Sequence, residues 1–304
     1  MMKENRLLEM RIFKAVVDAG GFTAAAHLLG VSQPFVSQTM TSLERRLGVQ
    51  LIHRSTRGHR LTGEGEQFLS ACGRILNEIE LAEAQVSSAR SKVSGELRIS
   101  APLAFGLDQI VPLLPEAMAD QPNVVFHLAL SDSIANLIED NVDVAIRMGR
   151  LTDSSLKSRK LCDLQRLVVA APSYLEAHGL PQTPADLRRH NCLMWEGPRD
   201  HLNRWSFRID GTVETLLASG NFRSSNGLTL FELCTAGVGI MRLAEHLALP
   251  AIREGKLVPL LSDHQVHDDT AISAVFLPER ELLPRIRNFV DYLVEAFRQP
   301  PWSE

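Results

Sequence analysis

The first 48 residues alternate apolar and polar positions with the period of short amphipathic helices. Apolar residues recur between charged ones over positions 7–17, which predicts a first helix. A second helix is predicted from Thr23 to Leu29. It is expected to turn four apolar residues inward: Ala25, Ala26, Leu28 and Leu29. After a tight turn over 30–32, Ser32 is a suitable N-cap and Pro34 falls in the first helical turn, so a third helix begins there and ends at Gly48.

The third predicted helix has one buried and one exposed face. Its buried stripe, with spacings of 4, 3 and 4, consists of Val36, Met40, Leu43 and Leu47. The exposed face and leading end carry small hydrogen-bonding groups and, further along, a cation: Gln33, Ser37, Gln38, Thr41 and Arg45. Amide and hydroxyl groups can read base edges in the major groove, while arginine and a helix N-terminus hold phosphates. For this helix alone, an ordinary solvated face is the alternative.

The next segment, residues 51–62, is typical of a short basic hairpin. Its alternation predicts two strands with a turn at Gly58 and with Arg54, Arg57 and Arg60 at the tip. Such a wing can place arginine on phosphates or in the minor groove, which supplies affinity without reading the major groove. Together, the helices and the wing indicate a winged helix-turn-helix and favour DNA binding over a merely solvated face.

Residues 64–92 predict one long helix, which Ser94 and Gly95 then interrupt. Its apolar seam alternates steps of 4 and 3: Phe68, Cys72, Ile75, Ile79, Ala82, Val86 and Ala89. This is the heptad period of a two-stranded coiled coil, so the seam is expected to pair two chains. A helix packed on its own body is the alternative.

From Glu96 onward, strands alternate with helices. A first unit has predicted strands at 97–99, 124–130 and 142–148 and helices at 106–119, kinked or begun at Pro112, and at 134–139. This βαβαβ order favours a mostly parallel sheet covered by helices. A second unit is predicted from segments at 164–170, 174–178, 184–190, 192–195, 204–209, 227–236 and 238–243. The strand at 269–277 and the helix at 282–297 are interpreted as a return to the first unit.

In open α/β sheets, ligands lie beyond the carboxyl ends of the strands. Those ends supply a candidate polar or anion site: Ser100, Ala101, Leu103, Ser131, Arg147 and Ser225. Phe105 and Trp195 are candidate apolar walls, which leave room for an aromatic acid. The alternative is that the serines are helix caps and that Arg147 pairs with an acid such as Asp143.

Bulk composition gives the frame for these motifs. The 304 residues are 45% hydrophobic and 22% charged, which suits two or three packed domains, and no apolar run is long enough for a membrane span. The N-terminus is no signal peptide, so the cytoplasm is the expected location. The net charge of −4 hides an asymmetry: residues 1–62 hold nine Lys and Arg against four acids, or +5, which leaves −9 on the rest. A basic module on an acidic body is typical of a DNA-binding protein.

Motifs for catalysis and for metals are absent from the sequence. It contains no phosphate-binding glycine loop, no Gly-x-Ser-x-Gly and no zinc pattern, so no cofactor, metal or enzymatic activity is expected. The cluster at 264–269 favours a solvated loop, with a metal site as the alternative. The four cysteines, Cys72, Cys162, Cys192 and Cys234, are expected to be structural thiols; a redox switch is the alternative.

The stretch from Phe22 to Thr62 resembles the DNA-binding domain of LysR-type transcriptional regulators. The resemblance is carried by an aromatic with an Ala-Ala pair, then Val-Ser-Gln-Pro, Val-Ser, Leu-Glu, Leu-Gly and Leu-Thr. Gln38 and Ile52 depart from the family, which often has a basic residue and Phe there. The effector part is also similar, through Arg98–Pro102, Asp143–Gly149 and Ala171–Leu175.

The resemblance implies a fold, a set of domains and a set of contacts. The fold is an all-α winged helix-turn-helix (1–63), a linker helix (64–92) and an α/β effector domain (93–304) of two periplasmic-binding-protein-like subdomains, about 93–161 with 269–304 and about 162–268. The expected DNA contacts are Thr23, Ser32, Gln33, Pro34, Ser37, Gln38, Thr41, Arg54, Thr56 and Arg57. The expected partners are double-stranded promoter DNA, a small-molecule effector, further copies in a homodimer or homotetramer, and RNA polymerase.

Two other classes of function explain the sequence less well than a ligand-responsive DNA-binding regulator. A solute-binding or transport component would explain the two-lobed body but neither the wing nor the absence of a signal sequence. A metabolic enzyme would explain neither end of the chain. Only the regulator accounts for the wing, the charge asymmetry, the heptad helix and the body together.

Overall fold

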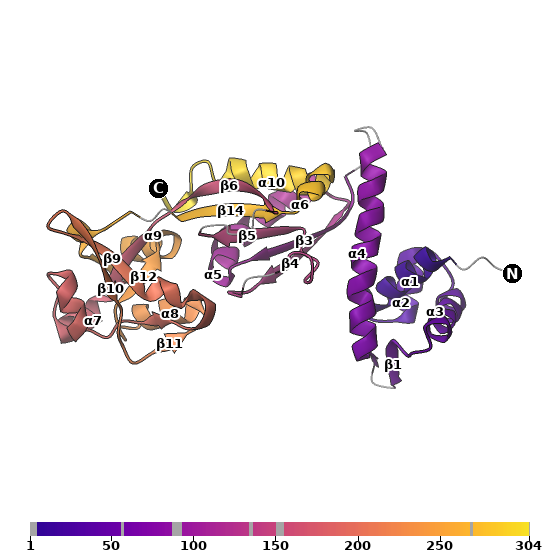
Figure 1. Ribbon diagram of the computed structural model, residues 1–304, viewed down its shortest axis with the longest axis horizontal. Coiled ribbons are helices and arrows are strands. Elements are labelled where there is room, and N and C mark those ends of the chain that lie inside the picture. Colours follow the sequence, from indigo (N-terminus) through magenta and orange to yellow (C-terminus); the bar gives the residue numbers. More distant parts are fainter. Residues whose placement is uncertain are drawn as a thin grey trace. The chain divides into compact units, whose positions relative to one another are not determined.

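The computed structural model describes residues 5–55, 58–86, 93–133, 136–149, 155–267 and 270–303 (Figure 1). Their contacts divide the chain into two compact units, Met1–Ser91 with Asn136–Asn141 and Lys92–Ala135 with Val142–Glu304. The domain boundaries given above, which separate the linker helix and divide the effector part in two, remain predictions.

The first unit consists of four helices and a hairpin. In chain order its elements are α1 (Arg6–Asp18), α2 (Phe22–Leu29), α3 (Gln33–Leu47), β1 (Ile52–Ser55), β2 (Gly58–Leu61) and α4 (Gly63–Val86). The predicted limits of α3 are confirmed: the Ser32 hydroxyl accepts the Phe35 N–H at 3.3 Å, and Gly48 ends the helix with φ +74°. A left-handed residue of this kind is where glycine costs least.

The core of this unit joins α1, α2, α3 and α4. The predicted stripe of α3 is buried, with Leu47 packed at its margin. The prediction for α2 was wrong at two positions, since Leu28 is 69% and Leu29 38% exposed. Ala26 is buried, and Leu28 lies about 200° further around the helix, so it points away from the core. Phe22, not assigned to the core beforehand, is buried instead.

The hairpin pairs β1 with β2 in antiparallel register, from Ile52 with Leu61 to Ser55 with Gly58. Gly58, where the turn was predicted, is the first residue of β2 and pairs with Ser55, the last residue of β1. Arg60 pairs with His53 and so lies away from the tip. Thr56 and Arg57 lie outside the described residues.

The first residues of the predicted seam of helix α4 pack into the core of their own unit. Phe68 contacts Phe13 with ring centroids 5.4 Å apart, and Cys72 is fully buried in the same core. The assignment of Cys72 to an interface between chains was therefore wrong, because the helices of its own chain already cover it. Further along, Ile75 is 41% exposed, Ile79 is half-buried and Ala82 is exposed. The side chain of Val86 and the residue Ala89 lie outside the described part.

The second unit begins with a five-stranded sheet, which we call the first lobe together with the helices on it. The strand order is β4-β3-β5-β14-β6. These strands are β3 (Gly95–Ala101), β4 (Val124–Leu130), β5 (Val144–Met148), β6 (Lys157–Leu164) and β14 (Thr270–Phe276). Strand β3 is parallel to β4 and β5, whereas β14 is antiparallel to β5 and β6. The predicted return of the chain to this sheet is confirmed by β14 and by α10 (Pro284–Ala296), which lies along β6 in Figure 1.

Three features of the first lobe differ from the sequence interpretation. The single helix predicted over 106–119 is a composite of α5 (Leu103–Phe105), the π-helical η1 (Gly106–Ile110), the 3-10 turn η2 (Val111–Leu113) and α6 (Leu114–Asp120). Pro112 and Pro115 each lack an N–H, which breaks regular α-helical bonding here. Strand β6 was missed, because its alternation is weak. Of the helix predicted over 134–139, the described residues 136–141 form turns.

The second lobe is built around β7 (Arg166–Ala170), which pairs with β12 (Met241–Ala244) on one side and β13 (Val258–Leu260) on the other. Alternate residues of β7 enter two cores: Val168 and Ala170 pack with Trp205, whereas Val169 packs with Leu230. The other elements are α7 (Pro172–His178), η3 (Pro184–Arg189), β8 (Met194–Trp195), η4 (Gly197–Asn203), β9 (Arg204–Ile209), β10 (Thr212–Leu217), β11 (Arg223–Ser224), α8 (Gly227–Thr235), α9 (Glu245–Arg253) and η5 (Ser262–His264), with η6 (Pro278–Leu282) and η7 (Pro301–Ser303) following β14. Strand β10 and helix α9 were not predicted.

Candidate functional site

The leading end of α3 presents polar side chains to solvent. Of the residues predicted to contact DNA, six are exposed: Thr23, Ser32, Gln33, Pro34, Gln38 and Thr41. Ser37 is half-buried, and its carbonyl accepts the Thr41 hydroxyl at 2.9 Å. The Thr41 oxygen therefore keeps its acceptor capacity for an outside donor. This arrangement gives the leading end of α3 exposed amide and hydroxyl side chains.

Ionic contacts fix α3 within its unit. Arg46 donates from Nε and Nη2 to Glu9 of α1, at 3.0 and 2.6 Å. The Glu44 carboxylate accepts the N–H groups of Leu51 and Ile52, which anchors the start of the hairpin. The Arg46 side chain therefore holds α3 against α1. Arg45 is exposed, so its positive charge faces solvent. The side chain of Arg54 lies outside the described part, as do Thr56 and Arg57.

A second candidate site is a pocket in the effector part, at the carboxyl ends of strands of the first lobe and against the second lobe. The empty space between its walls is about 480 Å³, a figure that includes open solvent. Apolar side chains form much of its wall: Pro102, Ala104, Phe105, Met148, Trp195, Leu202, Met241, Leu243, Ala244 and Leu247. The two wall candidates from the sequence, Phe105 and Trp195, are therefore both placed at this pocket.

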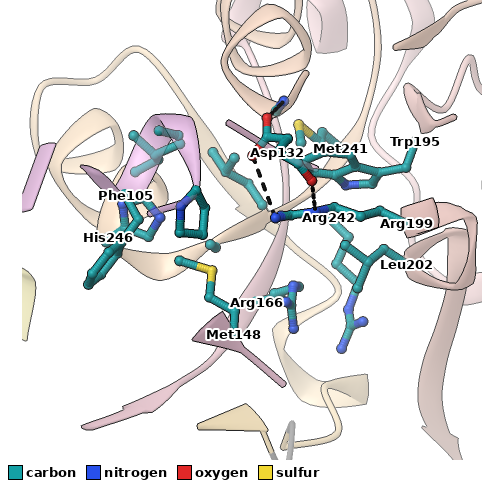
Figure 2. Close-up of a pocket in the computed structure, with 16 residues that line it drawn as sticks. Phe105, Asp132, Met148, Arg166, Trp195, Arg199, Leu202, Met241, Arg242 and His246 are labelled. Carbon is teal, nitrogen blue, oxygen red and sulfur yellow. Dashed lines mark hydrogen bonds and ion pairs between the residues drawn. The ribbon is translucent and has the colours of Figure 1, made fainter. Parts of the chain in front are cut away.

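Asp132 and Arg199 form the polar centre of the pocket (Figure 2). Asp132 follows β4 in the first lobe; its carboxylate accepts the N–H of Gly227, the first residue of α8, at 3.1 Å. Arg199 of η4 donates from Nε to the Asp132 carbonyl at 3.2 Å, lies 3.6 Å from its carboxylate and stacks over Trp195, 5.4 Å from the ring centroid. Burial lowers the pKa of Arg199, and the Asp132 carboxylate partly counters this. The two residues tie the two lobes together across the pocket.

His246 forms a second connection between the lobes. It belongs to α9, is almost fully buried, and its Nδ1 lies 3.0 Å from the Asp108 carboxylate in η1. Its ring meets Phe105 edge-on at 5.2 Å and Trp302 at 5.9 Å. In Figure 2, His246 and Phe105 lie at one side of the pocket and Trp195 and Arg199 at the other. The remaining polar lining consists of Arg166 and Arg242, and Arg166 donates to the Thr270 hydroxyl at 3.2 Å.

The six residues predicted to bind an effector lie beside this pocket without lining it. Ser100 and Ala101 are buried within β3, Leu103 begins α5, and Ser131 is exposed and hydrogen-bonded to Ser133. Arg147 lies in β5 opposite Ser273, and Ser225 is exposed before α8. Their chain neighbours line the pocket instead: Pro102, Asp132, Met148 and Gly227. Arg147 and Met148 belong to β5, where side chains alternate between faces, so an error of one residue is enough there to move a side chain out of the site.

The alternative pairing of Arg147 with Asp143 is wrong. The Asp143 carboxylate accepts from Arg280 at 2.6 Å and from the Arg98 N–H at 2.9 Å, and both Asp143 and Arg280 are buried. Burial raises the pKa of Asp143, and Arg280 opposes that shift. Sequence separation hid this partner, because the two residues are 137 positions apart.

All four cysteines are buried and free. Burial raises the pKa of Cys72 and Cys192 to about 11 and that of Cys162 and Cys234 to about 12. Thiols of such pKa are protonated near neutral pH and react slowly, which supports a structural role.

Among the described residues, no three His, Cys, Asp or Glu side chains are grouped to hold a metal ion, and no helix is long and apolar enough to cross a membrane. In the cluster at 264–269, His264 Nδ1 lies 2.9 Å from the Arg208 carbonyl, while residues 268–269 lie outside the described part.

Known proteins resemble both parts of this chain. Residues 7–66 match the family described as "Bacterial regulatory helix-turn-helix protein, lysR family", and residues 90–298 match "LysR substrate binding domain". The chain is 36% identical over 287 residues to the HTH-type transcriptional regulator CrgA of Neisseria meningitidis serogroup C (strain 8013), over 94% of this chain and 95% of CrgA. It is 34% identical over 299 residues to the HTH-type transcriptional activator AaeR of Escherichia coli (strain K12), over 96% and 95%.

A solved structure shows the same architecture. The structure of CrgA, described as a LysR-type transcriptional regulator from Neisseria meningitidis, matches this one with a TM-score of 0.64 at 35% sequence identity, over 96% of this chain and 99% of that chain. The similarity therefore extends over the helix-turn-helix and the effector part alike.

Proposed function

We propose that this chain, which belongs to the LysR family of transcriptional regulators, carries out its function at two sites. The chain binds DNA through its helix-turn-helix, and its effector domain responds to a small molecule. We assign effector binding to the pocket around Asp132 and Arg199. The observation that supports this most is the joining of both lobes at a polar pair inside an apolar pocket, where a ligand can alter their arrangement.

The proposed DNA contacts follow from the exposed end of α3. Gln33, Pro34, Ser37, Gln38 and Thr41 face the major groove in this proposal, with Thr23 and Ser32 near phosphates. Arg54, Thr56 and Arg57 contact the backbone or minor groove from the wing. The polarity of the α3 surface supports the first set, and the basic composition of residues 51–62 supports the second.

Assembly is proposed through α4. The exposed Ile75 and Ala82 and the half-buried Ile79 form the part of the seam that the chain's own core leaves accessible. A homodimer formed there would place two α3 helices on half-sites about 34 Å apart or a multiple of it. We further propose that the effector domains assemble the chain into a homotetramer and that the chain contacts RNA polymerase. Because its target is genomic DNA, the cytoplasm is the proposed location. The chain is also proposed to act by binding rather than by catalysis.

The proposed effector is a small anion with an apolar or aromatic part. Among the described lining residues, Arg166, Arg199 and Arg242 outnumber the single acid Asp132, and most other lining residues are apolar. A carboxylate gains charge-assisted hydrogen bonds from guanidinium groups, and Trp195 and Phe105 offer flat surfaces to a ring. A ligand that binds one arrangement of the lobes tenfold more tightly than the other shifts the equilibrium between the two arrangements by about 1.4 kcal/mol.

The test uses benzoate and a panel of small carboxylates, each beside its neutral amide, in thermal unfolding of the full chain. Carboxylates should raise the unfolding temperature and amides should not, because only the former recruit the arginines. Arg199→Met should abolish the shift, while Ser225→Ala, at an exposed position outside the pocket, should keep it. Equal shifts for acid and amide, or an undiminished shift in Arg199→Met, would contradict the assignment.

A further inference from the structure

The first turn of α3 carries a large aromatic side chain at its surface. Phe35 is 36% exposed, although Val36, Met40 and Leu43 of the same helix are buried. We propose that Phe35 is a specificity-determining residue that contacts the 5-methyl group of a thymine in the major groove. The inference rests on the proposed docking of α3 in that groove, and it adds an apolar contact to a surface so far described by its hydrogen-bonding groups.

The position of Phe35 on α3 supports this role. Successive helical residues are about 100° apart, so Phe35 shares a face with Gln38 and Ser42, three and seven residues further on. Both of these side chains are exposed. The buried stripe begins at Val36, about 100° further around the helix. Phe35 is therefore next to Gln38, at the edge of the surface that would meet base edges and about 160° around the helix axis from Gln33.

The backbone that carries the ring is fixed on both sides. The Phe35 N–H donates to the Ser32 hydroxyl at 3.3 Å, and its carbonyl accepts the Thr39 hydroxyl at 2.8 Å. A side chain on such a turn has few torsions left to order when it meets a ligand. An aromatic side chain on such an ordered backbone can therefore act as a probe of shape.

Thymine is the complementary partner by chemistry. Among unmodified bases, only thymine carries a methyl group in the major groove, and apolar side chains such as phenylalanine recognise it there. Contact with that methyl removes apolar surface of both partners from water. A protein partner is the alternative occupant, since Leu28 and Val31 are also exposed. DNA is favoured because Phe35 belongs to α3 and is flanked by Pro34 and Gln38, whereas Leu28 belongs to α2.

The experiment begins with selection from a random-sequence duplex library by the full chain and by Phe35→Ala. The wild type should enrich a thymine in each half-site that the variant does not enrich. Deoxyuridine, which lacks only the methyl, then replaces that thymine in one half-site. Wild-type affinity should fall about fourfold, or about 0.8 kcal/mol, the value for one buried carbon group. Phe35→Ala should bind both duplexes equally, so the two changes are not additive.

Control variants distinguish a failure of this inference from a failure of the proposed docking of α3 in the major groove. Leu28→Ala, at a more exposed apolar position outside α3, should discriminate thymine from deoxyuridine as the wild type does. If Gln33→Ala and Ser37→Ala change base preference but deoxyuridine has no effect, or acts equally on Phe35→Ala, the role of Phe35 is overturned and the docking of α3 stands. If none of the three α3 variants changes base preference, the docking itself is wrong.

Discussion

The helix-turn-helix and the proposed effector pocket collect their side chains in opposite ways. The predicted groove contacts on α3 come from one segment, Ser32 to Thr41, held by bonds between residues three or four apart. The pocket takes its groups from segments between Pro102 and Leu247, and Asp132 meets Gly227 across 95 positions of sequence. A contiguous site can be recognised from its residue pattern, whereas a site assembled by the fold can be recognised only by its approximate place.

The largest effect is expected from breaking a contact in the effector part between two residues that are far apart in the sequence. Arg280→Met leaves the buried Asp143 carboxylate without its ion-pair partner and should lower the free energy of unfolding by about 3–5 kcal/mol. Urea unfolding followed by tryptophan fluorescence measures this, since all three tryptophans lie between positions 195 and 302. As the control, Arg298→Met removes an exposed i,i+3 pair and should change stability by less than about 0.5 kcal/mol. Equal effects of the two variants would refute the argument.

The next effect tests whether the contiguous pattern of α4 describes an interface. Replacing both Ile75 and Ile79 by Asp would bury charges between two chains, so dimerisation should weaken at least about a hundredfold, or about 2.7 kcal/mol. Sedimentation equilibrium measures the mass. Glu78→Ala, at an exposed position of the same helix, should leave the dimer intact. A double variant that sedimented as a DNA-binding dimer would place the interface elsewhere.

A smaller effect distinguishes reading from positioning in the DNA interface. Gln33→Ala should change base preference, with about 1–3 kcal/mol for each lost base contact. Arg57→Ala should weaken binding to all sequences alike and flatten the salt dependence, because a phosphate contact carries no sequence information. Affinities for a panel of single-base variants at several salt concentrations measure both. The reverse result, with base preference changed by Arg57→Ala and not by Gln33→Ala, would show that the roles were assigned the wrong way round.

The smallest effect concerns the local bonds that hold α3. Ser32→Ala removes the N-cap acceptor for Phe35 N–H and should cost about 1 kcal/mol of the stability of the first unit. Ser32→Asn, which restores an acceptor, should recover most of it. Circular dichroism during thermal unfolding of residues 1–91 and of the full chain measures the change. If Ser32→Ala were as stable as Ser32→Asn, this bond would contribute nothing to α3.

How far the sequence could predict each region depended on the range of the interactions involved. The limits of α3, its buried stripe and strand β4 were predicted correctly, because capping residues and periodicity are local signals. The errors at Leu28 and Leu29 lie in the last turn of α2. Strand β6 was missed because its alternation is weak, and helix α9, which contains Pro250, was not assigned either.

The sequence by itself determined that this chain has a helix-turn-helix with a polar exposed face on α3 and an α/β body with polar residues at the ends of its strands. These properties follow from periodicity, capping and the order of elements. Only the tertiary structure decided that Cys72 belongs to the chain's own core, that Asp143 pairs with Arg280, and that Asp132 and Arg199 occupy the pocket instead of Ser131 and Arg147. Pairings between distant residues depend on how strands and helices pack, and local chemistry leaves many partners equally possible.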